Sequence, residues 1–191
     1  NHSQSTALDI RSEFKHKGKS IMSNIRATIE GVSSIKKYCL SESLDELSPI
    51  FIKKSRFKSK TNPSLNFGPA DSGLYPFRIT LKNEDKLDNN SKEVKLFLKN
   101  WASKNKYYRY KKRFSWVTSN KLFRIDLTAV KASDKGQSLN QYTYSKSFKE
   151  AGILSKNEQY ELEIEYIGSV SETFDLPPIY KFYDIMNISP F

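Results

Sequence analysis

The 191-residue chain contains one cysteine, Cys39, so it cannot form an internal disulfide bond. Histidines are also scarce: His2 and His16, together with this cysteine, are too few for a zinc site, which draws mainly on cysteine and histidine ligands. Any metal is therefore expected to be a hard ion bound by oxygen atoms. Cys39 is followed by Leu-Ser, without the glycines and arginine of a cysteine-dependent phosphatase loop, and we expect it in the core or at a helix end.

Long apolar runs are missing too. No stretch approaches the roughly 18 consecutive apolar residues of a membrane span, and no hydrophobic signal segment opens the chain. We therefore expect a soluble, cytoplasmic protein with no membrane partner. The length and the 37% hydrophobic content are enough for one sizeable core, so residues 1–191 are expected to form a single domain.

Positive charge is in excess. The chain has 32 Lys and Arg against 21 Asp and Glu, which gives a formal net charge of +11. Such a charge favours polyanionic partners, namely nucleic acids, nucleotides or an anionic surface, without choosing among them.

Hydrophobic spacing predicts three helices. The first spans residues 20–38, where Ile21, Ile25, Ile29, Val32 and Ile35 recur at nearly helical period behind Ser20 as N-cap. The second spans residues 91–101, and a third short helix follows two prolines at residues 179–186.

Other segments alternate between polar and apolar residues with the period of a β-strand. These predicted strands are Phe51–Lys58, Tyr75–Lys82, Tyr107–Val117, Lys121–Val130 and Gln159–Gly168. Between the first two, residues 61–73 contain two prolines and two glycines and are predicted to be a loop.

The sharpest feature is an acidic strand. Its period places Glu161, Glu163 and Glu165 on one face, opposite Leu162 and Ile164. Neighbouring carboxylates lie roughly 7 Å apart, so at an effective dielectric constant near ~20 each adjacent pair repels by about 2 to 3 kcal/mol. A hard divalent cation would turn this repulsion into affinity, whereas the simpler interpretation is a strand whose acidic side faces solvent.

Two other strands have polar faces of the same period. One places Arg109, Lys111 and Arg113 on one side, and the next places Arg124, Asp126 and Thr128 on one side. A solvated basic strand is one alternative for the first. Another is a nonspecific nucleic-acid surface with aromatic residues available for stacking, namely Tyr107, Tyr108, Tyr110 and Trp116.

The shared alternation predicts the fold class. If the apolar faces point outward against helices, the ionic faces converge inward, as in a closed antiparallel β-barrel of about eight strands with flanking helices, in the α+β class. Basic side chains would then contact phosphate oxygens across the lumen. The candidates for this role are Arg78, Arg109, Lys111, Arg113 and Arg124.

Three segments resemble the triphosphate tunnel metalloenzymes, most closely the RNA triphosphatase domain of mRNA capping enzymes from large DNA viruses. They read FRITLKNE at residues 77–84, YYRYKKRFSWVTSNKLFRIDLTAVK at residues 107–131 and YELEIEYIG at residues 160–168, in the order of the family. The resemblance covers about a third of the chain. It implies a metal-dependent enzyme that removes the γ-phosphate from nascent mRNA, in a virus that transcribes in the cytoplasm.

The resemblance also implies roles for individual residues. Glu161, Glu163, Glu165 and Asp9 are similar to metal ligands for Mg²⁺ or Mn²⁺, with Glu163, Lys111 and Arg113 as catalytic residues and Asp126 and Thr128 as supporting lumen residues. The family has two glutamates on its first strand, whereas this chain has Ala7 and Asp9, with Glu13 in another register. One expected acid is therefore missing.

Two alternatives to RNA triphosphatase stay open. The same site could act on free tripolyphosphate or nucleoside triphosphates, because it contacts only the shared anion. The domain could also be a noncatalytic module that binds RNA or docks other capping modules, such as a guanylyltransferase or methyltransferase, in which case residues 1–191 are part of a longer capping enzyme.

Overall fold

A computed structural model of the chain describes residues 2–56, 70–71, 78–80, 82–134 and 142–168. The predicted helix at residues 179–186 and most of the predicted loop at residues 61–73 lie outside these ranges. None of the helices in the described ranges is long and apolar enough to cross a membrane.

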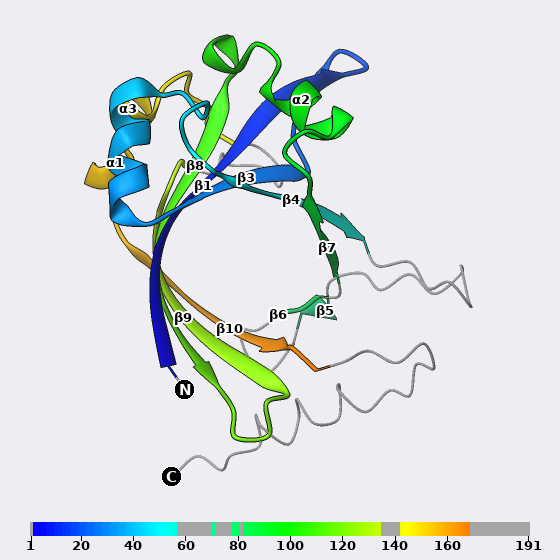
Figure 1. Ribbon diagram of the computed structural model, residues 1–191, viewed down its shortest axis with the longest axis vertical. Coiled ribbons are helices and arrows are strands. Elements are labelled where there is room, and N and C mark those ends of the chain that lie inside the picture. Colours follow the sequence, from blue (N-terminus) through cyan, green and yellow to red (C-terminus); the bar gives the residue numbers. More distant parts are fainter. Residues whose placement is uncertain (1, 57–69, 72–77, 81, 135–141, 169–191) are drawn as a thin grey trace.

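Eight strands form one antiparallel sheet, in the order β10-β9-β8-β1-β3-β4-β7 with β2 paired to β1. The strands are β1 (His2–His16), β2 (Lys19–Met22), β3 (Ile25–Glu30), β4 (Ile50–Arg56), β7 (Lys82–Leu87), β8 (Lys106–Val117), β9 (Phe123–Ala132) and β10 (Gln159–Tyr166). The sheet curls strongly, so that β7 and β10 lie on either side of a central space (Figure 1). The described part of the sheet is thus an open half-barrel and not the closed barrel predicted from the sequence.

A separate two-stranded sheet joins β5 (Ala70–Asp71) to β6 (Arg78–Ile79). Figure 1 shows it on the open side of the curl, between β7 and β10 in that view. The predicted strand Tyr75–Lys82 is therefore divided: Arg78 and Ile79 belong to β6, Lys82 begins β7, and the rest of it, except Thr80, lies outside the described residues.

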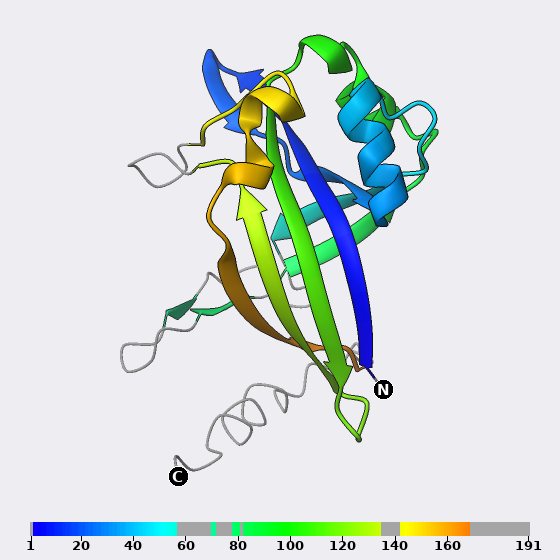
Figure 2. The ribbon, with the colours of Figure 1, turned by 90° about the vertical axis from the view of Figure 1, so that its left-hand side faces the viewer.

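Three short helices pack at one end of the sheet (Figures 1 and 2). They are α1 (Val32–Ser41), α2 (Lys92–Leu98) and α3 (Phe148–Ala151), with 3-10 turns at Trp101–Ser103 and Ile153–Ser155. The predicted second helix is confirmed, and its Ser91 hydroxyl accepts a hydrogen bond from the Val94 amide, as expected of an N-cap. The core lies between these helices and the convex face of the sheet, around Leu8, Tyr38 and Tyr108.

The predicted helix at residues 20–38 is wrong over its first half. That part forms β2 and β3, and α1 begins only at Val32, after Gly31 with a φ of 83°. In β3 the side chains of Ile25, Ala27 and Ile29 are buried in the core, and the strand pairs with β1 on one side and β4 on the other. Hydrogen bonding on both edges favours the strand over a helix of marginal length.

The strands predicted around the ionic residues are confirmed as β8, β9 and β10, with boundaries shifted by one or two residues. Their register aligns Glu161 with Thr128, Glu163 with Asp126, and Glu165 with Arg124. Since directly opposed residues of antiparallel strands share a face, the acidic and basic residues do share the concave face.

The helices of the described ranges cover only half the length of the convex face (Figure 2). At the uncovered end, Phe114, Trp116 and Leu162 are exposed, Leu162 to 67%. The prediction that the apolar faces pack against helices therefore holds only for the half of the sheet nearest α1.

Candidate anion-binding site on the concave face

Each glutamate of β10 contacts an arginine, Glu165 one from the adjacent β9 and the other two one each from β8, the next strand beyond. The distance is 2.7 Å from Arg109 Nη2 to Glu161 Oε2, 3.2 Å from Arg113 Nη2 to Glu163 Oε2 and 2.5 Å from Arg124 Nη2 to Glu165 Oε2. The glutamate side chains are about half exposed, so these pairs are open to water on one side. The acidic row is thus neutralised by arginines that the register places beside it.

Asp126 lies beneath this row and is 1% exposed. It accepts a hydrogen bond from Ser115 at 2.6 Å and pairs with Arg113 at 3.0 Å and Arg124 at 3.1 Å. The Thr128 hydroxyl accepts a further hydrogen bond from Arg113 Nε at 3.2 Å. Asp126 thus orients both guanidinium groups, and Thr128 helps to orient that of Arg113.

Asp9 is a second buried acid, on β1. Lys111 Nζ lies 2.6 Å from its carboxylate, Arg26 Nε lies 3.7 Å away, and the Thr28 hydroxyl donates a hydrogen bond of 2.8 Å. Burial alone raises the pKa of Asp9, but the positive charges of Lys111 and Arg26 and these hydrogen bonds outweigh it and hold the pKa below its usual value. Burial lowers the pKa of Lys111, while the Asp9 carboxylate acts in the opposite direction.

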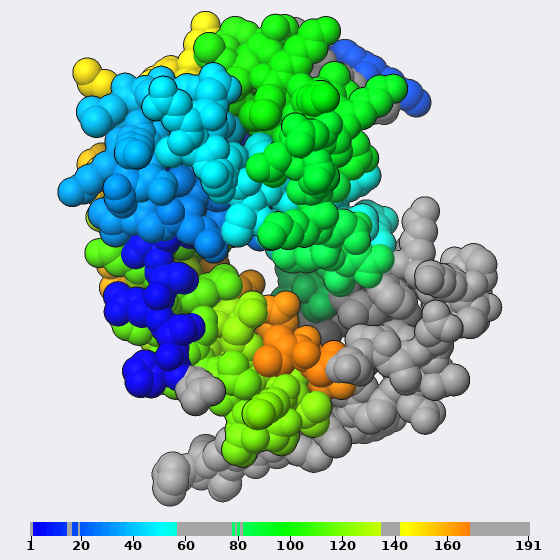
Figure 3. Space-filling model, viewed as in Figure 1, coloured from blue at the N-terminus to red at the C-terminus, as the bar shows by residue number. Residues whose placement is uncertain are grey.

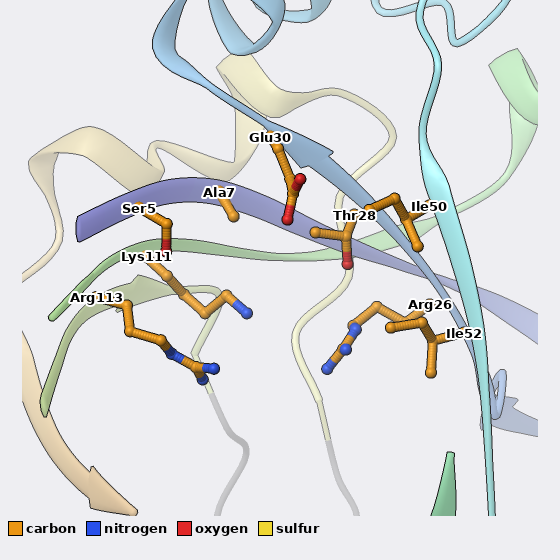
Figure 4. Close-up of a pocket in the computed structure, with 9 residues that line it drawn as sticks. All are labelled: Ser5, Ala7, Arg26, Thr28, Glu30, Ile50, Ile52, Lys111 and Arg113. Carbon is orange, nitrogen blue, oxygen red and sulfur yellow. The ribbon is translucent and has the colours of Figure 1, made fainter. Parts of the chain in front are cut away.

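A cavity of about 130 Å³ opens on this face between β1, β3, β4 and β8. Its lining consists of Ser5, Ala7, Arg26, Thr28, Glu30, Ile50, Ile52, Lys111 and Arg113. Figure 4 shows Lys111 and Arg113 extending from β8, and Arg26 from β3, toward the middle of this space. In the space-filling view the molecule is hollowed at its centre, with the atoms of β10 beside the opening (Figure 3).

The cavity is suited to an anion. Three of its nine lining residues are cationic and one is acidic. Each cation also contacts carboxylates that offset part of its charge: Lys111 contacts Asp9, Arg26 contacts Asp9 and Glu84, and Arg113 contacts Asp126 and Glu163. Arg26 Nε is buried and has no hydrogen-bond partner among the described residues, although unsatisfied buried donors are rare in folded proteins. At an effective dielectric constant near 20, a unit negative charge about 4 Å from one of these cations gains about 4 kcal/mol.

The four predicted metal ligands do not fit a divalent ion as they are arranged. Glu161, Glu163 and Glu165 each pair with an arginine, and Asp9 pairs with Lys111. Across the residues that the structure describes, no group of three or more His, Cys, Asp and Glu side chains is placed to hold a metal ion. In each case the cationic partner offsets negative charge that would otherwise attract a metal ion.

The predicted phosphate-contacting residues divide into three sets. Lys111 and Arg113 line the cavity, Arg109 and Arg124 lie on the same face but pair with the acidic row, and Arg78 lies on β6 in the separate small sheet. The strand period of β8 places Lys111 and Arg113 on one face, and both do line the same cavity.

The residues that β3 contributes to the cavity, Arg26, Thr28 and Glu30, were not predicted, and neither were Ser5, Ile50 and Ile52. The position of the three β3 residues on the concave face was not predicted because residues 20–38 were assigned to a helix. The alternation of Ile25, Ala27 and Ile29 was the signal that could have placed them on one face of a strand.

The proposed stacking surface is largely unavailable. Tyr107 and Tyr108 are buried, and Tyr110 packs against the hydrophobic core. Trp116 is exposed, but it lies on the convex face with Phe114, whose ring centroid is 6.5 Å away. The basic strand therefore presents its cations to the concave face without stacking aromatics beside them.

Comparisons with known proteins give no family: no protein-family model matches the sequence, and no curated protein and no solved structure is significantly similar to it.

The Asp9 pair gives a prediction for acid stability. Because the folded-state pKa of Asp9 is lowered, its stabilising effect is fully present above the unfolded value of about 3.9 and is lost as the pH falls through the lower folded value. We expect Asp9→Asn to lower the free energy of unfolding near neutral pH, with a deficit that shrinks below about pH 4. Urea denaturation at a series of pH values measures this. Asp85→Asn, an exposed position on β7, is the control, and an Asp9→Asn deficit that stays constant with pH would contradict the assignment.

Proposed function

We propose that the concave face binds the 5′-triphosphate end of RNA and that the domain removes the γ-phosphate, the first step of cap formation. The observation on which this depends is the convergence of Arg26, Lys111 and Arg113 on one cavity. Arginine forks and a lysine ammonium together match the several oxygens of a polyphosphate better than those of a single carboxylate. The resemblance of β8, β9 and β10 to the tunnel enzymes supports the same substrate.

The closed tunnel is part of this proposal. β7 and β10 flank the open side of the half-barrel, and the small sheet of β5 and β6 lies between them in Figure 1. Closure on that side would surround a bound triphosphate and exclude bulk water. Excluding water strengthens each ion pair between the phosphates and the cations of β3 and β8.

The reaction needs a water molecule, and no covalent intermediate. The water oxygen attacks the γ-phosphorus in line, the bond from that phosphorus to the β–γ bridging oxygen breaks, and RNA with a 5′-diphosphate leaves together with inorganic phosphate. Arg113 and Lys111 offset the negative charge that accumulates on the departing diphosphate. Glu163, 3.2 Å from Arg113 and half exposed, is the carboxylate we assign to accept the proton of the water.

Release of labelled phosphate tests this function. RNA carrying a γ-labelled 5′-triphosphate is incubated with the protein in the presence of Mg²⁺ or Mn²⁺ and with a chelator. We expect release from the wild type and a loss of about 100-fold or more in Glu163→Gln, since a positioned general base contributes about that much. Glu46→Gln, an exposed position in the loop after α1, is the matched control. Release unchanged by Glu163→Gln excludes the role assigned to this residue.

Parallel incubations with nucleoside triphosphates and tripolyphosphate decide between RNA and the free anions. The cavity contacts only the phosphates they share, so a preference for RNA requires contacts outside it. Equal rates on all three substrates would identify a general tripolyphosphatase.

A noncatalytic binding module is the second candidate. Two observations favour it: the absence of a three-carboxylate group in the described ranges, and Ala7 lining the cavity where the resembling family has an acid. In that case triphosphate-ended RNA binds, Arg113→Ala weakens binding, and no phosphate is released under any metal condition. Such a module would present the RNA end to guanylyltransferase or methyltransferase modules.

A further inference from the structure

Glu30 is the only acidic residue among those lining the cavity. It is exposed at the end of β3, and no ion pair or hydrogen bond of its carboxylate is found among the described residues. Figure 4 shows its carboxylate pointing into the space that Arg26, Lys111 and Arg113 also face. Asp9, Asp126 and the three glutamates of β10, by contrast, each contact a cation.

The backbone holds Glu30 in this position. Gly31 adopts a φ of 83°, a conformation that favours glycine, and its amide donates a 2.9 Å hydrogen bond to the Thr6 carbonyl. Two residues earlier, the Thr28 hydroxyl is bonded to Asp9. Hydrogen bonds from Thr28 and Gly31, which lie before and after Glu30, thus fix this end of β3 to β1 and hold the carboxylate at the cavity.

A free carboxylate in a phosphate-binding cavity repels its own ligand. The repulsion is removed if a divalent cation lies between the carboxylate and the phosphate oxygens. Magnesium is commonly bound in this way, by one or two carboxylates together with the phosphates of the substrate and several waters, and it needs no preformed protein cage. A single carboxylate is therefore enough for this mode of binding, although it is too few for a resident metal site.

We infer that Glu30 binds the divalent cation of a Mg²⁺–polyphosphate complex, so that metal and phosphate enter this cavity together. The inference rests on the proposed phosphate site. It adds that the metal arrives with the polyphosphate and that Glu30 is its protein ligand. It also accounts for the absence of a three-carboxylate group among the described residues, because the phosphates supply the other ligands.

The binding of tripolyphosphate, followed by calorimetry with and without Mg²⁺, tests the inference without any need for hydrolysis. Metal and phosphate binding are coupled reciprocally, so we expect Mg²⁺ to tighten tripolyphosphate binding to the wild type by about tenfold or more. Glu30→Gln should reduce this Mg²⁺ effect to about twofold or less, with tighter metal-free binding, since the repulsion is gone. Glu46→Gln should behave as the wild type.

A second variant moves the carboxylate from β3 to the directly opposed position on β1. Ala7 lies directly opposite Glu30 in the register of β1 and β3, and both line the cavity. Moving the carboxylate across the pair in Ala7→Glu/Glu30→Ala should restore the Mg²⁺ effect that Glu30→Ala loses, since directly opposed side chains lie about 5 Å apart. Thermal unfolding of each variant checks that the fold is retained.

The outcomes separate this inference from the proposed function. A Mg²⁺ effect that persists in Glu30→Gln, or that is absent from the wild type, overturns the inference while phosphate binding stands. Failure of the wild type to bind tripolyphosphate with or without Mg²⁺ overturns the proposed site and the inference with it.

Discussion

Arg113→Ala is expected to weaken the binding of tripolyphosphate roughly 10- to 100-fold, because one charge-assisted contact to a desolvated anion is worth about 1.5 to 3 kcal/mol. Arg113 is the cavity residue held most firmly, by Asp126 at 3.0 Å, Thr128 at 3.2 Å and Glu163 at 3.2 Å. Its guanidinium group therefore loses little freedom when a phosphate binds. Calorimetric titration in a metal-free buffer measures the change directly.

The strand itself provides the control for this experiment. Lys112 is the next residue on β8, is exposed, and faces the convex side. Lys112→Ala removes one positive charge from the same strand and should leave the affinity within about twofold of the wild type, because exposed charges are screened. Equal losses in both variants would mean that net charge governs binding, and the cavity assignment would then be wrong.

Lys111→Met is expected to lower the free energy of unfolding by about 3 to 5 kcal/mol, since it leaves the buried carboxylate of Asp9 without its closest cation. Arg26, 3.7 Å away, and Thr28 remain, and they place the loss near the lower end of this range. Urea denaturation at neutral pH gives the value.

Neutralising Asp9 as well should restore much of the stability that Lys111→Met loses. In Asp9→Asn/Lys111→Met the buried group is neutral and can still accept the Thr28 hydrogen bond, so the double variant should be more stable than Lys111→Met alone. Lys112→Met is the control on the opposite face. If Lys111→Met and Lys112→Met are equally stable, the Asp9–Lys111 pair does not have the structural role given to it here.

The sequence predicted β8, β9 and β10 because each alternates between a mainly polar and a mainly apolar face, with exceptions such as Lys112 of β8 and Lys131 of β9 on the apolar faces. The segment that forms β3 was misassigned for a definite reason. Ile21, Ile25 and Ile29 are spaced by four residues, and that spacing keeps side chains on one face both at a period of about 3.6 and at a period of 2. Only pairing with β1 and β4 decides between the two, and pairing is not visible in local sequence.

The same limit applies to the candidate site. The period of β10 put Glu161, Glu163 and Glu165 on one face, but such a row fits a solvated face as well as a metal site, and only the resemblance favoured metal ligands. Their ion pairs with Arg109, Arg113 and Arg124 depend on the register of β8, β9 and β10 and on the lengths of the side chains. Glu30 could not be predicted as the free carboxylate until β3 was known to be a strand.

β10 is an edge strand of the described sheet, and its glutamates affect how that edge can pair with other strands. In the part of the chain that the structure describes, only its β9 side is hydrogen-bonded, so its other side offers a template on which a foreign strand could add. Inward-pointing charged side chains on an edge strand disfavour such pairing. They matter here because Leu162 is exposed on the convex face of the same strand. We therefore expect the acidic row also to disfavour edge-to-edge aggregation of the protein.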